Sequence, residues 1–324
     1  MIFNFLKHLA NSENKMKLDV GFQMDPIEGL NVSEDSTLAI MLECLSNQYR
    51  VWQFHPNDVS YLNGCVFADA KNILEINESK TPFFKSSNKE KINLENLDVI
   101  FVRQDPPFDI SYVTSTYLLE YIEKKVKIIN KPSEIRNSPE KLLLNNWHEL
   151  TPKTLISRNF NEINDFKNKY KDVIVKPLYG NGGHGVFLIK KDDKNFHSLI
   201  EMFMERNNEQ FIIQEYIPEI TKGDKRIILI NGQPLGAINR IPGDADVRAN
   251  LHVGGEAHKT NLSKKEIYIC ETIGPYLKKK GLLFVGIDVI GGKLTEINVT
   301  SPTGLREIYK LNNVNLAKNI LGLF

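Results

Sequence analysis

The stretch KPLYGNGGHGV, residues 176–186, constrains the fold more than any other part of the chain. Gly180, Gly182 and Gly185 fit the G-x-G-x-x-G spacing of dinucleotide-binding folds, but that site needs a helix after the glycines. Here the β-branched and aromatic run 186–189 follows, which is typical of a strand. A P-loop is also excluded, because no Gly-Lys-Ser/Thr follows the glycines.

An apolar strand also precedes the glycines, so we expect them to cap a β-hairpin. Such a tip can lay backbone N–H groups against a phosphate chain, because glycine has no Cβ and adopts positive φ at little cost. Lys176 at the base of the hairpin favours phosphate binding. The alternative for a glycine cluster considered alone is a mobile surface turn.

The overall composition points to a folded protein with a small-molecule partner. With 324 residues the chain suits two or three packed units. Lys and Arg number 41 against 40 Asp and Glu, so no global field favours nucleic acid or an anionic membrane. The three cysteines, Cys44, Cys65 and Cys270, lack metal-ligand spacing and an even count, which indicates ordinary thiols in a reducing compartment.

The N-terminus shows no targeting signal. Residues 1–15 contain too short an apolar segment, and no small-residue cleavage pattern, for secretion. No run approaches the roughly 18 apolar residues of a membrane span. We therefore expect a cytoplasmic protein in which residues 1–15 are a disordered extension and Met16 is a possible start.

The order of elements predicts an α/β fold in three parts. Residues 16–138 read strand, helix, strand, helix, strand, which indicates a parallel sheet with helical cover. Residues 139–218 contain the glycine hairpin. Residues 219–324 begin a new unit, in which Asn231-Gly232 between apolar runs predicts another hairpin.

Three oxygen donors interrupt two apolar strands near the C-terminus. Asp288 lies within 284–290, and Glu296 and Asn298 share one face of 294–299 because strand side chains alternate. Carboxylate and amide oxygens without nearby His or Cys match Mg²⁺ or Mn²⁺. The alternative is a polar face turned to solvent.

The turn between these strands decides whether the donors meet. A strict two-residue Gly291-Gly292 turn pairs Asp288 with Thr295 and leaves Glu296 on the other face. A three-residue loop including Lys293, or a bulge, places Asp288 opposite Glu296, and this is the arrangement that we expect. With the glycine hairpin it indicates a nucleoside triphosphate site. A protein kinase is excluded, because H-R-D and D-F-G segments are missing.

Ten motifs in order resemble those of bacterial (prokaryotic-type) glutathione synthetase, an ATP-grasp ligase, from about Met16 to the C-terminus: MDPIEGLN, FVRQDPPFD, NKP, PEKL, IVKPLYGNGGHGVF, IIQEYIPE, GDKR, NRIPG, FVGIDVI and TEINVTSPTGLRE. The resemblance implies an N-terminal parallel-sheet domain followed by two ATP-grasp subdomains that clamp ATP, the small one at 139–218. It also implies ATP-dependent joining of γ-glutamylcysteine to glycine through an acyl phosphate. The family's members are commonly dimers or tetramers, so a homo-oligomer is expected.

Site residues follow from the same resemblance. ATP would be bound by Lys141, Lys176, Gly182, Gly183, Gln214, Glu215, Ile217 and Asp224. The metal would be bound by Asp288, Glu296 and Asn298. The catalytic arginines would be Arg226, Arg240 and Arg248. Substrates would be held by these arginines and by Asp25, Asn250, Ser301 and Thr303. Without the resemblance, Lys141 is an ordinary solvated lysine and the arginines are salt-bridge partners.

Three features qualify the comparison with the family. Tyr179 and Asn181 replace an aspartate and a methionine in the glycine loop, and Glu215 stands where some members carry asparagine. These changes leave backbone phosphate binding intact.

The polar segment 241–259 suits a loop that closes over the site, with poor order in the absence of ligand. Another ATP-grasp amino-acid ligase and a non-catalytic nucleotide-binding regulator remain as alternatives.

Overall fold

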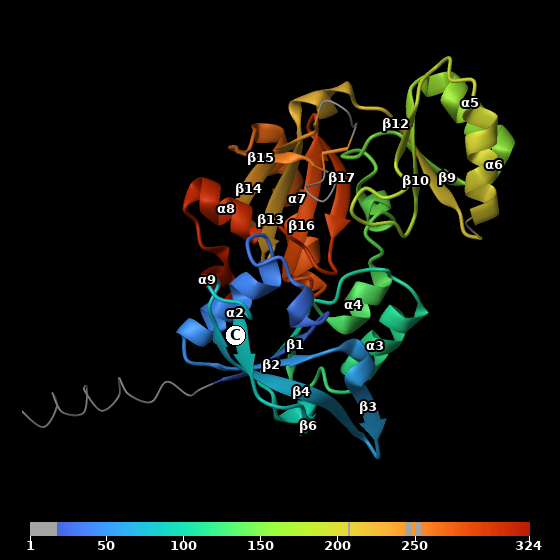
Figure 1. The fold of residues 1–324 in the computed structure, drawn as a ribbon. Coiled ribbons are helices and arrows are strands. Elements are labelled where there is room, and N and C mark those ends of the chain that lie inside the picture. The colour runs from blue at the N-terminus through green and yellow to red at the C-terminus, as the bar shows by residue number, and fades with distance from the viewer. Residues whose placement is uncertain (1–17, 207, 244–247, 250–253) are drawn as a thin grey trace, which may run out of the picture.

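The structure is a computed structural model that describes residues 18–206, 208–243, 248–249 and 254–324. The predicted extension 1–15, the start at Met16 and the substrate-binding Asn250 lie outside these residues, as does part of the segment 241–259. Three separate sheets organise the described chain (Figure 1). Among the described residues, no helix combines the length and the hydropathy needed to cross a membrane.

The first sheet belongs to the N-terminal part and is mixed. Its strands run in the order β3-β4-β2-β1-β7-β8, and β5 and β6 also pair with β4. Their bounds are β1 (Asp19–Gln23), β2 (Arg50–Phe54), β3 (Val59–Leu62), β4 (Cys65–Ile76), β5 (Phe84–Ser86), β6 (Glu90–Asn93), β7 (Val99–Val102) and β8 (Lys127–Ile129). The helices of this part are α2 (Ser36–Ser46), α3 (Ile110–Glu120) and α4 (Pro132–Asn137), with short 3-10 helices η1 (Ile27–Gly29), η2 (Pro56–Asp58) and η3 (Leu94–Asn96).

The predicted parallel sheet forms only half of this assembly. β2, β1, β7 and β8 are parallel neighbours, whereas β4 pairs with β2, β3, β5 and β6 in antiparallel fashion. The prediction missed this antiparallel half. The buried parallel strands are continuous apolar runs, but half-exposed antiparallel strands alternate polar and apolar residues and give a weaker signal.

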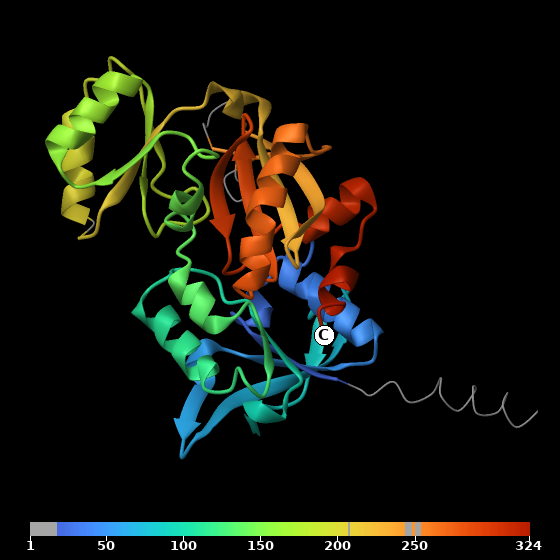
Figure 2. The ribbon, with the colours of Figure 1, turned by 180° about the vertical axis from the view of Figure 1, so that it is seen from behind.

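The second sheet carries the glycine hairpin. It is antiparallel, in the order β11-β10-β12-β9, with bounds β9 (Thr154–Ser157), β10 (Val173–Pro177), β11 (Phe187–Ile189) and β12 (Phe211–Glu215). Helices α5 (Phe160–Tyr170) and α6 (Phe196–Arg206) cover one face (Figure 2). This part has its own core, which includes Val173, Val175 and Ile213. The predicted hairpin on both sides of the glycines is confirmed.

The third sheet is antiparallel and contains the second predicted hairpin. Its order is β15-β14-β13-β16-β17, with bounds β13 (Asp224–Ile230), β14 (Gln233–Ile241), β15 (Glu256–Lys259), β16 (Phe284–Ile290) and β17 (Lys293–Asn298). β13 and β14 are joined at Asn231 and Gly232, both at positive φ, which confirms the Asn-Gly turn. The remaining elements are η4 (Leu143–Trp147), η5 (Pro218–Lys222), α7 (Lys264–Lys279), α8 (Leu305–Asn312) and α9 (Leu316–Leu321).

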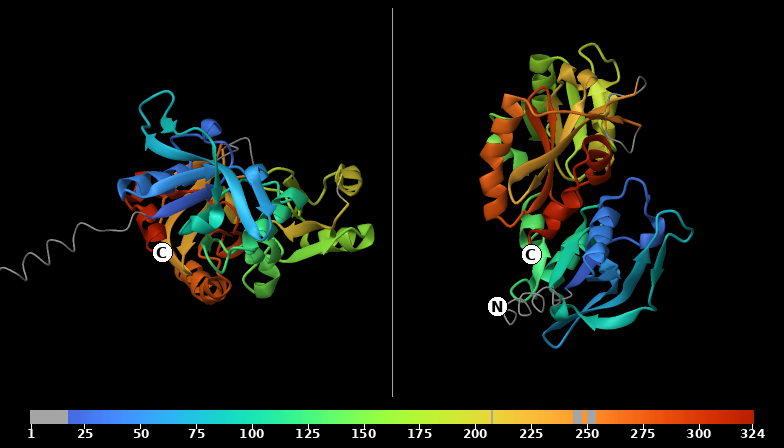
Figure 3. Two further views of the ribbon diagram at one scale, coloured as in Figure 1. Left: turned by 90° about the horizontal axis from the view of Figure 1, so that it is seen from below. Right: turned by 90° about the vertical axis from the view of Figure 1, so that its left-hand side faces the viewer.

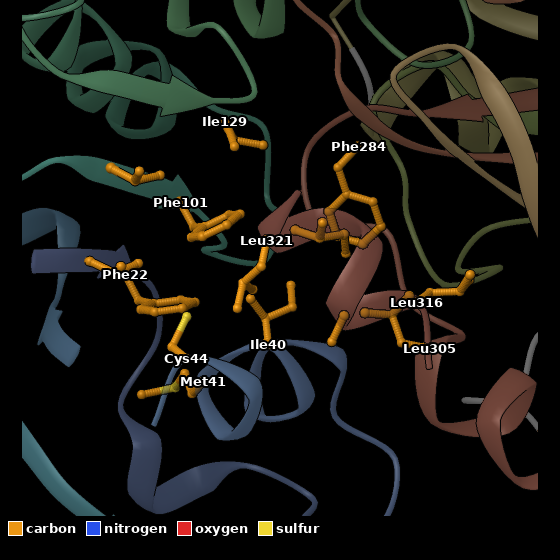
Figure 4. Close-up of a cluster of buried hydrophobic side chains, with 14 of the residues drawn as sticks. Phe22, Ile40, Met41, Cys44, Phe101, Ile129, Phe284, Leu305, Leu316 and Leu321 are labelled. Atoms are coloured by element: carbon orange, nitrogen blue, oxygen red, sulfur yellow. The ribbon is translucent and has the colours of Figure 1, made fainter. Parts of the chain in front are cut away.

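The first and third parts share a hydrophobic core. Side chains of α2 and the first sheet, such as Phe22 and Met41, belong to the same buried cluster as Phe284 and the C-terminal Leu305 and Leu321 (Figure 4). The buried Asn130 adds polar contacts, since its amide donates to the carbonyl oxygens of residues 284 and 299 at 2.7 and 2.8 Å. The second part stands apart with its separate core (Figure 3). The two bodies that share a core therefore present a rigid wall to the glycine hairpin.

Candidate active site

The strand pair β16–β17 brings the predicted carboxylates together. Asp288 lies opposite Glu296, with a shift in register between Asp288 and Val289. The turn itself is the two-residue Gly291-Gly292 turn, with both glycines at positive φ, so a bulge at Thr295 makes the difference. The Thr295 hydroxyl donates to the backbone oxygen of Asp288 at 3.1 Å. The expected register is thus confirmed, and the bulge produces it.

Strand alternation separates the two faces of this sheet. Ile287, Val289 and Ile297 turn toward α7 and join its core. Asp288 faces the other way and is buried with only 3% of its side chain exposed. The polar side chains therefore point away from the helix-covered face, as charged groups in such apolar strands must.

Two arginines and a second carboxylate surround Asp288. Arg226 donates from Nε to Oδ1 at 2.5 Å and from Nη2 to Oδ2 at 3.0 Å. Nη2 of Arg240 lies 3.0 Å from Asp288 Oδ1 and donates to Oδ2 of Asp224 at 2.6 Å. These four buried residues of β13, β14 and β16 are called the ion cluster below.

The pKa values give the ion cluster a positive bias. Burial raises the pKa of Asp224 to about 7, against the lowering effect of Arg240. Burial also acts to raise the pKa of Asp288, but Arg226 and Arg240 outweigh it and hold that pKa well below its usual range. The cluster thus pairs two arginines with one carboxylate that is held ionised and one whose pKa is raised. Such a cluster attracts an anionic substrate.

The donor set fits a hard divalent cation shared with phosphate oxygens. Glu296 and Asn298 lie on the same face as Asp288. The buried amide nitrogen of Asn298, which has no partner among the described residues, is a donor that suits a phosphate oxygen, whereas the amide oxygen suits the cation. Within the described part of the chain, no three His, Cys, Asp or Glu side chains form a metal cage by themselves. The residues therefore fit a cation, such as Mg²⁺, that takes its remaining ligands from nucleotide and water.

A first cavity lies between the second and third sheets. Val173 and Val175 point into the core under α5 and α6, so Ile174 and Lys176 point to the opposite face and line this cavity. Most of the predicted ATP-binding residues line it: Lys141, Lys176, Gly183, Gln214, Glu215, Ile217 and Asp224. Gly182 does not, and lines a second cavity instead.

Two lysines carry the positive charge of this first cavity. Lys176 donates to the side-chain oxygen of Gln214 at 3.2 Å, and burial lowers its pKa to about 8. Nζ of Lys141 lies 3.4 Å from Oε1 of Glu296 and donates to the carbonyl oxygen of Gly180. The β16–β17 hairpin, which carries Asp288 and Glu296, is called the carboxylate hairpin below. Both ammonium groups thus lie between the glycine loop and this carboxylate hairpin.

The second cavity lies between the N-terminal part and the third sheet. It contains the predicted substrate residues Arg226, Arg240, Ser301 and Thr303 in its lining. Glu296 lines both cavities, so the carboxylate hairpin is their common wall.

Three predicted substrate residues are placed differently. Arg248 lines the first cavity, and its Nη1 donates to the carbonyl oxygen of Gly183 at 3.1 Å. Asp25 lines neither cavity, and its Oδ2 accepts from the backbone N–H of Asp105 at 2.7 Å. Asp25 therefore supports the wall of the second cavity. Asn250 lies outside the described residues.

The sequence prediction missed Arg103, Asp105 and Glu140, which also line the second cavity. Arg103 is buried, donates from Nε to Thr37 at 2.9 Å, and leaves Nη1 without a partner among the described residues. Glu140 accepts from the backbone N–H of Val299 at 3.0 Å and from the Thr300 hydroxyl at 2.9 Å. The signal for Arg103 was available, because it directly follows a buried parallel strand, where ligands usually bind.

Family models match almost all of this arrangement. The N-terminal domain of prokaryotic glutathione synthetase matches residues 18–136, and the ATP-grasp domain of prokaryotic glutathione synthetase matches residues 140–313. The chain belongs to the prokaryotic glutathione synthetase family. The predicted family and fold class are therefore confirmed, and the chain is an ATP-dependent ligase of glutathione biosynthesis.

Individual relatives agree with the family models. The chain is 48% identical to the glutathione synthetase of Agrobacterium fabrum over 92% of this chain and 93% of that protein. It is 38% identical to the glutathione synthetase of Vibrio parahaemolyticus, over 94% and 96% of the two chains.

Solved structures with the same fold are far more distant. The ATP-grasp ligase PsnB complexed with minimal precursor has a TM-score of 0.62 at 14% identity, covering 95% of this chain and all of that one. The D-cycloserine synthetase DcsG also has a TM-score of 0.62, at 12% identity, covering 93% and 99% of the two chains. At these identities the likeness shows the ATP-grasp fold alone.

Proposed function

We propose that the two cavities hold ATP and γ-glutamylcysteine, and that the chain joins the dipeptide to glycine through an acyl phosphate. The observation that carries this proposal is the position of Glu296, which lines both cavities directly opposite Asp288. A group transferred from one cavity to the other would therefore cross a boundary to which Glu296 belongs. Glu296 and Asp288 are also where a divalent cation would bind.

In the first cavity, Lys141 and Lys176 bind the phosphates of ATP. The backbone N–H group of Gly183 in this cavity and that of Gly182 at the adjoining second cavity, both residues at positive φ, would bind the same chain of phosphates. The strand end at Glu215 and the adjoining Ile217 border the far side of the cavity, where they hold the adenine. A bound divalent cation, Mg²⁺ or Mn²⁺, held by Asp288, Glu296 and Asn298 would neutralise charge on the transferring phosphoryl group.

In the second cavity, the ion cluster lowers the repulsion between a substrate carboxylate and the triphosphate. Arg226 and Arg240 attract the carboxylate of the cysteinyl residue, and Arg248 reaches the glycine loop from the other side. The carboxylate oxygen attacks the γ-phosphorus and ADP leaves. The amine of glycine then attacks the acyl carbon, phosphate leaves, and the amine loses a proton.

The loop after β17 is suited to hold the substrates. Ser301 and Thr303 line the second cavity, and Glu140 fixes the start of this loop through Val299 and Thr300. Arg103 lines the same cavity, and its buried Nη1, which has no partner among the described residues, adds a further donor for a carboxylate.

Three finer points belong to the same proposal. We propose that the protein works in the cytoplasm, that it forms a homodimer or homotetramer, and that the domains span 16–138, 139–218 and 219–324. Sedimentation of the purified protein would decide its oligomeric state. Limited proteolysis would reveal whether cleavage concentrates near residues 138 and 218.

Kinetics with purified protein would test the reaction. Phosphate release from ATP should require γ-glutamylcysteine and glycine together and should match glutathione formation one to one. Phosphate release that is faster with another acceptor amine than with glycine would contradict the substrate assignment. ATP binding without turnover on any of these substrates would favour a nucleotide-binding regulator.

A further inference from the structure

An aromatic contact joins the glycine loop to the N-terminal part of the chain. Tyr179 lies in the loop after β10, and Phe108 lies in the segment between β7 and α3. Their ring centroids are 6.3 Å apart with an interplanar angle of 19°, which is a stacked arrangement. Phe108 also packs against Tyr112 of α3 at 5.2 Å, so the N-terminal partner of the stack is itself held in place.

The two segments meet over more than one side chain. Pro106 and Phe108 from one segment and Leu178 and Tyr179 from the other line the same small crevice. Next to it, Lys141 donates to the carbonyl oxygen of Gly180.

The contact connects the walls of the two cavities. Phe108 lies only a few residues after Arg103 and Asp105 in the chain, and both of these residues line the second cavity. Tyr179 directly precedes the glycines that line the first cavity. The stack therefore joins the two loops that line the two cavities.

We propose that Tyr179 is a positioning residue that docks the glycine loop on Phe108 in the arrangement needed for phosphoryl transfer. This inference rests on the proposed function. An acyl phosphate is lost to hydrolysis when water reaches it, so a well-seated loop protects the intermediate until glycine attacks. Stacking carries the contact, and the side chain of Tyr179, 41% exposed, makes it with its ring face.

Four single variants and one double variant test this role. They are Tyr179→Ala, Phe108→Ala, Tyr179→Phe, the Tyr179→Ala and Phe108→Ala pair, and Tyr268→Ala as a control. Tyr268 is a 60% exposed tyrosine of α7. Glutathione and phosphate should be measured in the same reaction, with thermal denaturation to verify folding.

Loss of the stack should lower turnover and should also uncouple ATP hydrolysis from glutathione formation. For Tyr179→Ala we expect kcat to fall by roughly 3- to 10-fold, the range of an aromatic pair. The ratio of phosphate to glutathione should rise above one, because water competes with glycine. Phe108→Ala should do the same, and the double variant should be no worse than either single variant. Tyr179→Phe and Tyr268→Ala should behave as wild type.

Two outcomes would overturn the inference. One is a Tyr179→Ala enzyme with the kcat of wild type and a ratio of phosphate to glutathione of one. The other is a double variant in which the two single effects simply multiply, since independent sites add in free energy. If Phe108→Ala unfolds, the comparison of Tyr179→Ala with Tyr179→Phe decides by itself.

A wild-type enzyme that makes no glutathione would contradict the proposed function, and the contact would then be tested by binding. Hydrogen exchange of residues 178–186 should slow when a non-hydrolysable ATP analogue and Mg²⁺ are added. Tyr179→Ala should lose this protection and Tyr179→Phe should keep it. Equal protection in all three proteins would overturn the role of the stack.

Discussion

The two glycine-tipped hairpins border the same two cavities but are built in opposite ways. In the β10–β11 hairpin, residues 178–186 separate the strands, and the backbone faces the site, where the carbonyl oxygens of Gly180 and Gly183 accept from Lys141 and Arg248. In the β16–β17 hairpin, the turn is only Gly291-Gly292, and the side chains of the strands face the site. The first hairpin depends on glycine conformation and the second on register. Changes to side chains should therefore be severe in the second and mild in the first.

The largest effect is expected at Asp288. Replacing it by Asn leaves Arg226 and Arg240 buried without the carboxylate that each of them contacts. Breaking a buried ion pair on one side costs about 3–5 kcal/mol of the free energy of unfolding. Urea denaturation of the Asp288→Asn protein would measure it. A loss of less than 1 kcal/mol would mean that water or Asp224 compensates the arginines.

Glu296→Gln should separate activity from stability. The Glu296 side chain is 20% exposed, and Lys141 is its one ion-pair partner within the described part of the chain, so the melting temperature should change little. Removing one anionic ligand of a phosphoryl-transfer site should lower kcat by about 10²–10³-fold. Glutathione formation would be measured beside Glu271→Gln, a matched change on the exposed side of α7. Activity near that of wild type would remove Glu296 from the site.

The register of the carboxylate hairpin could be predicted, and its charge environment could not. Alternation and the need to bring Asp288 and Glu296 together were enough to require a bulge or a longer loop. The pairing of Asp288 with Arg226 and Arg240 depends on β13 and β14, and no periodicity within 284–299 shows which strands lie beside it.

The same contrast holds for the rest of the molecule. Buried parallel strands such as β7 can be predicted from their apolar runs. The strand β4 alternates between buried and exposed residues, and the sequence prediction missed it. Arg103 and Glu140 were within recognised motifs, but each becomes a site residue only because the N-terminal part and the third sheet share a core. Contacts between distant parts of a chain leave little trace in local sequence.

Lys176 is the charged side chain at the base of the first hairpin, and pH should reveal its contribution. Its pKa in the free enzyme is lowered to about 8 by burial, so the ammonium form is half populated near pH 8, dominates well below that pH and is lost above it. Only the protonated form attracts phosphate, so the affinity for ATP should be highest well below pH 8. It should weaken by about tenfold between pH 8 and 9.5. ATP binding should also take up a proton in that range.

Calorimetry in buffers of different ionisation enthalpy would detect that proton uptake. Lys176→Arg is the control, because its guanidinium stays charged and its ATP affinity should be flat to pH 9.5. An equally flat profile for wild type would mean that Lys176 does not contact the phosphates.

The smallest effect is expected at the glycines of this loop, where it should depend on backbone conformation. Gly183 has φ of +80°, and alanine in this left-handed region costs about 1 kcal/mol. Gly183→Ala should therefore raise the KM for ATP by roughly fivefold, with little change in the melting temperature. His184→Ala, which changes a neighbouring exposed side chain and leaves the backbone free, should leave the KM unchanged. If instead His184→Ala had the larger effect, the loop would act through side chains, and the distinction between the two hairpins would be lost.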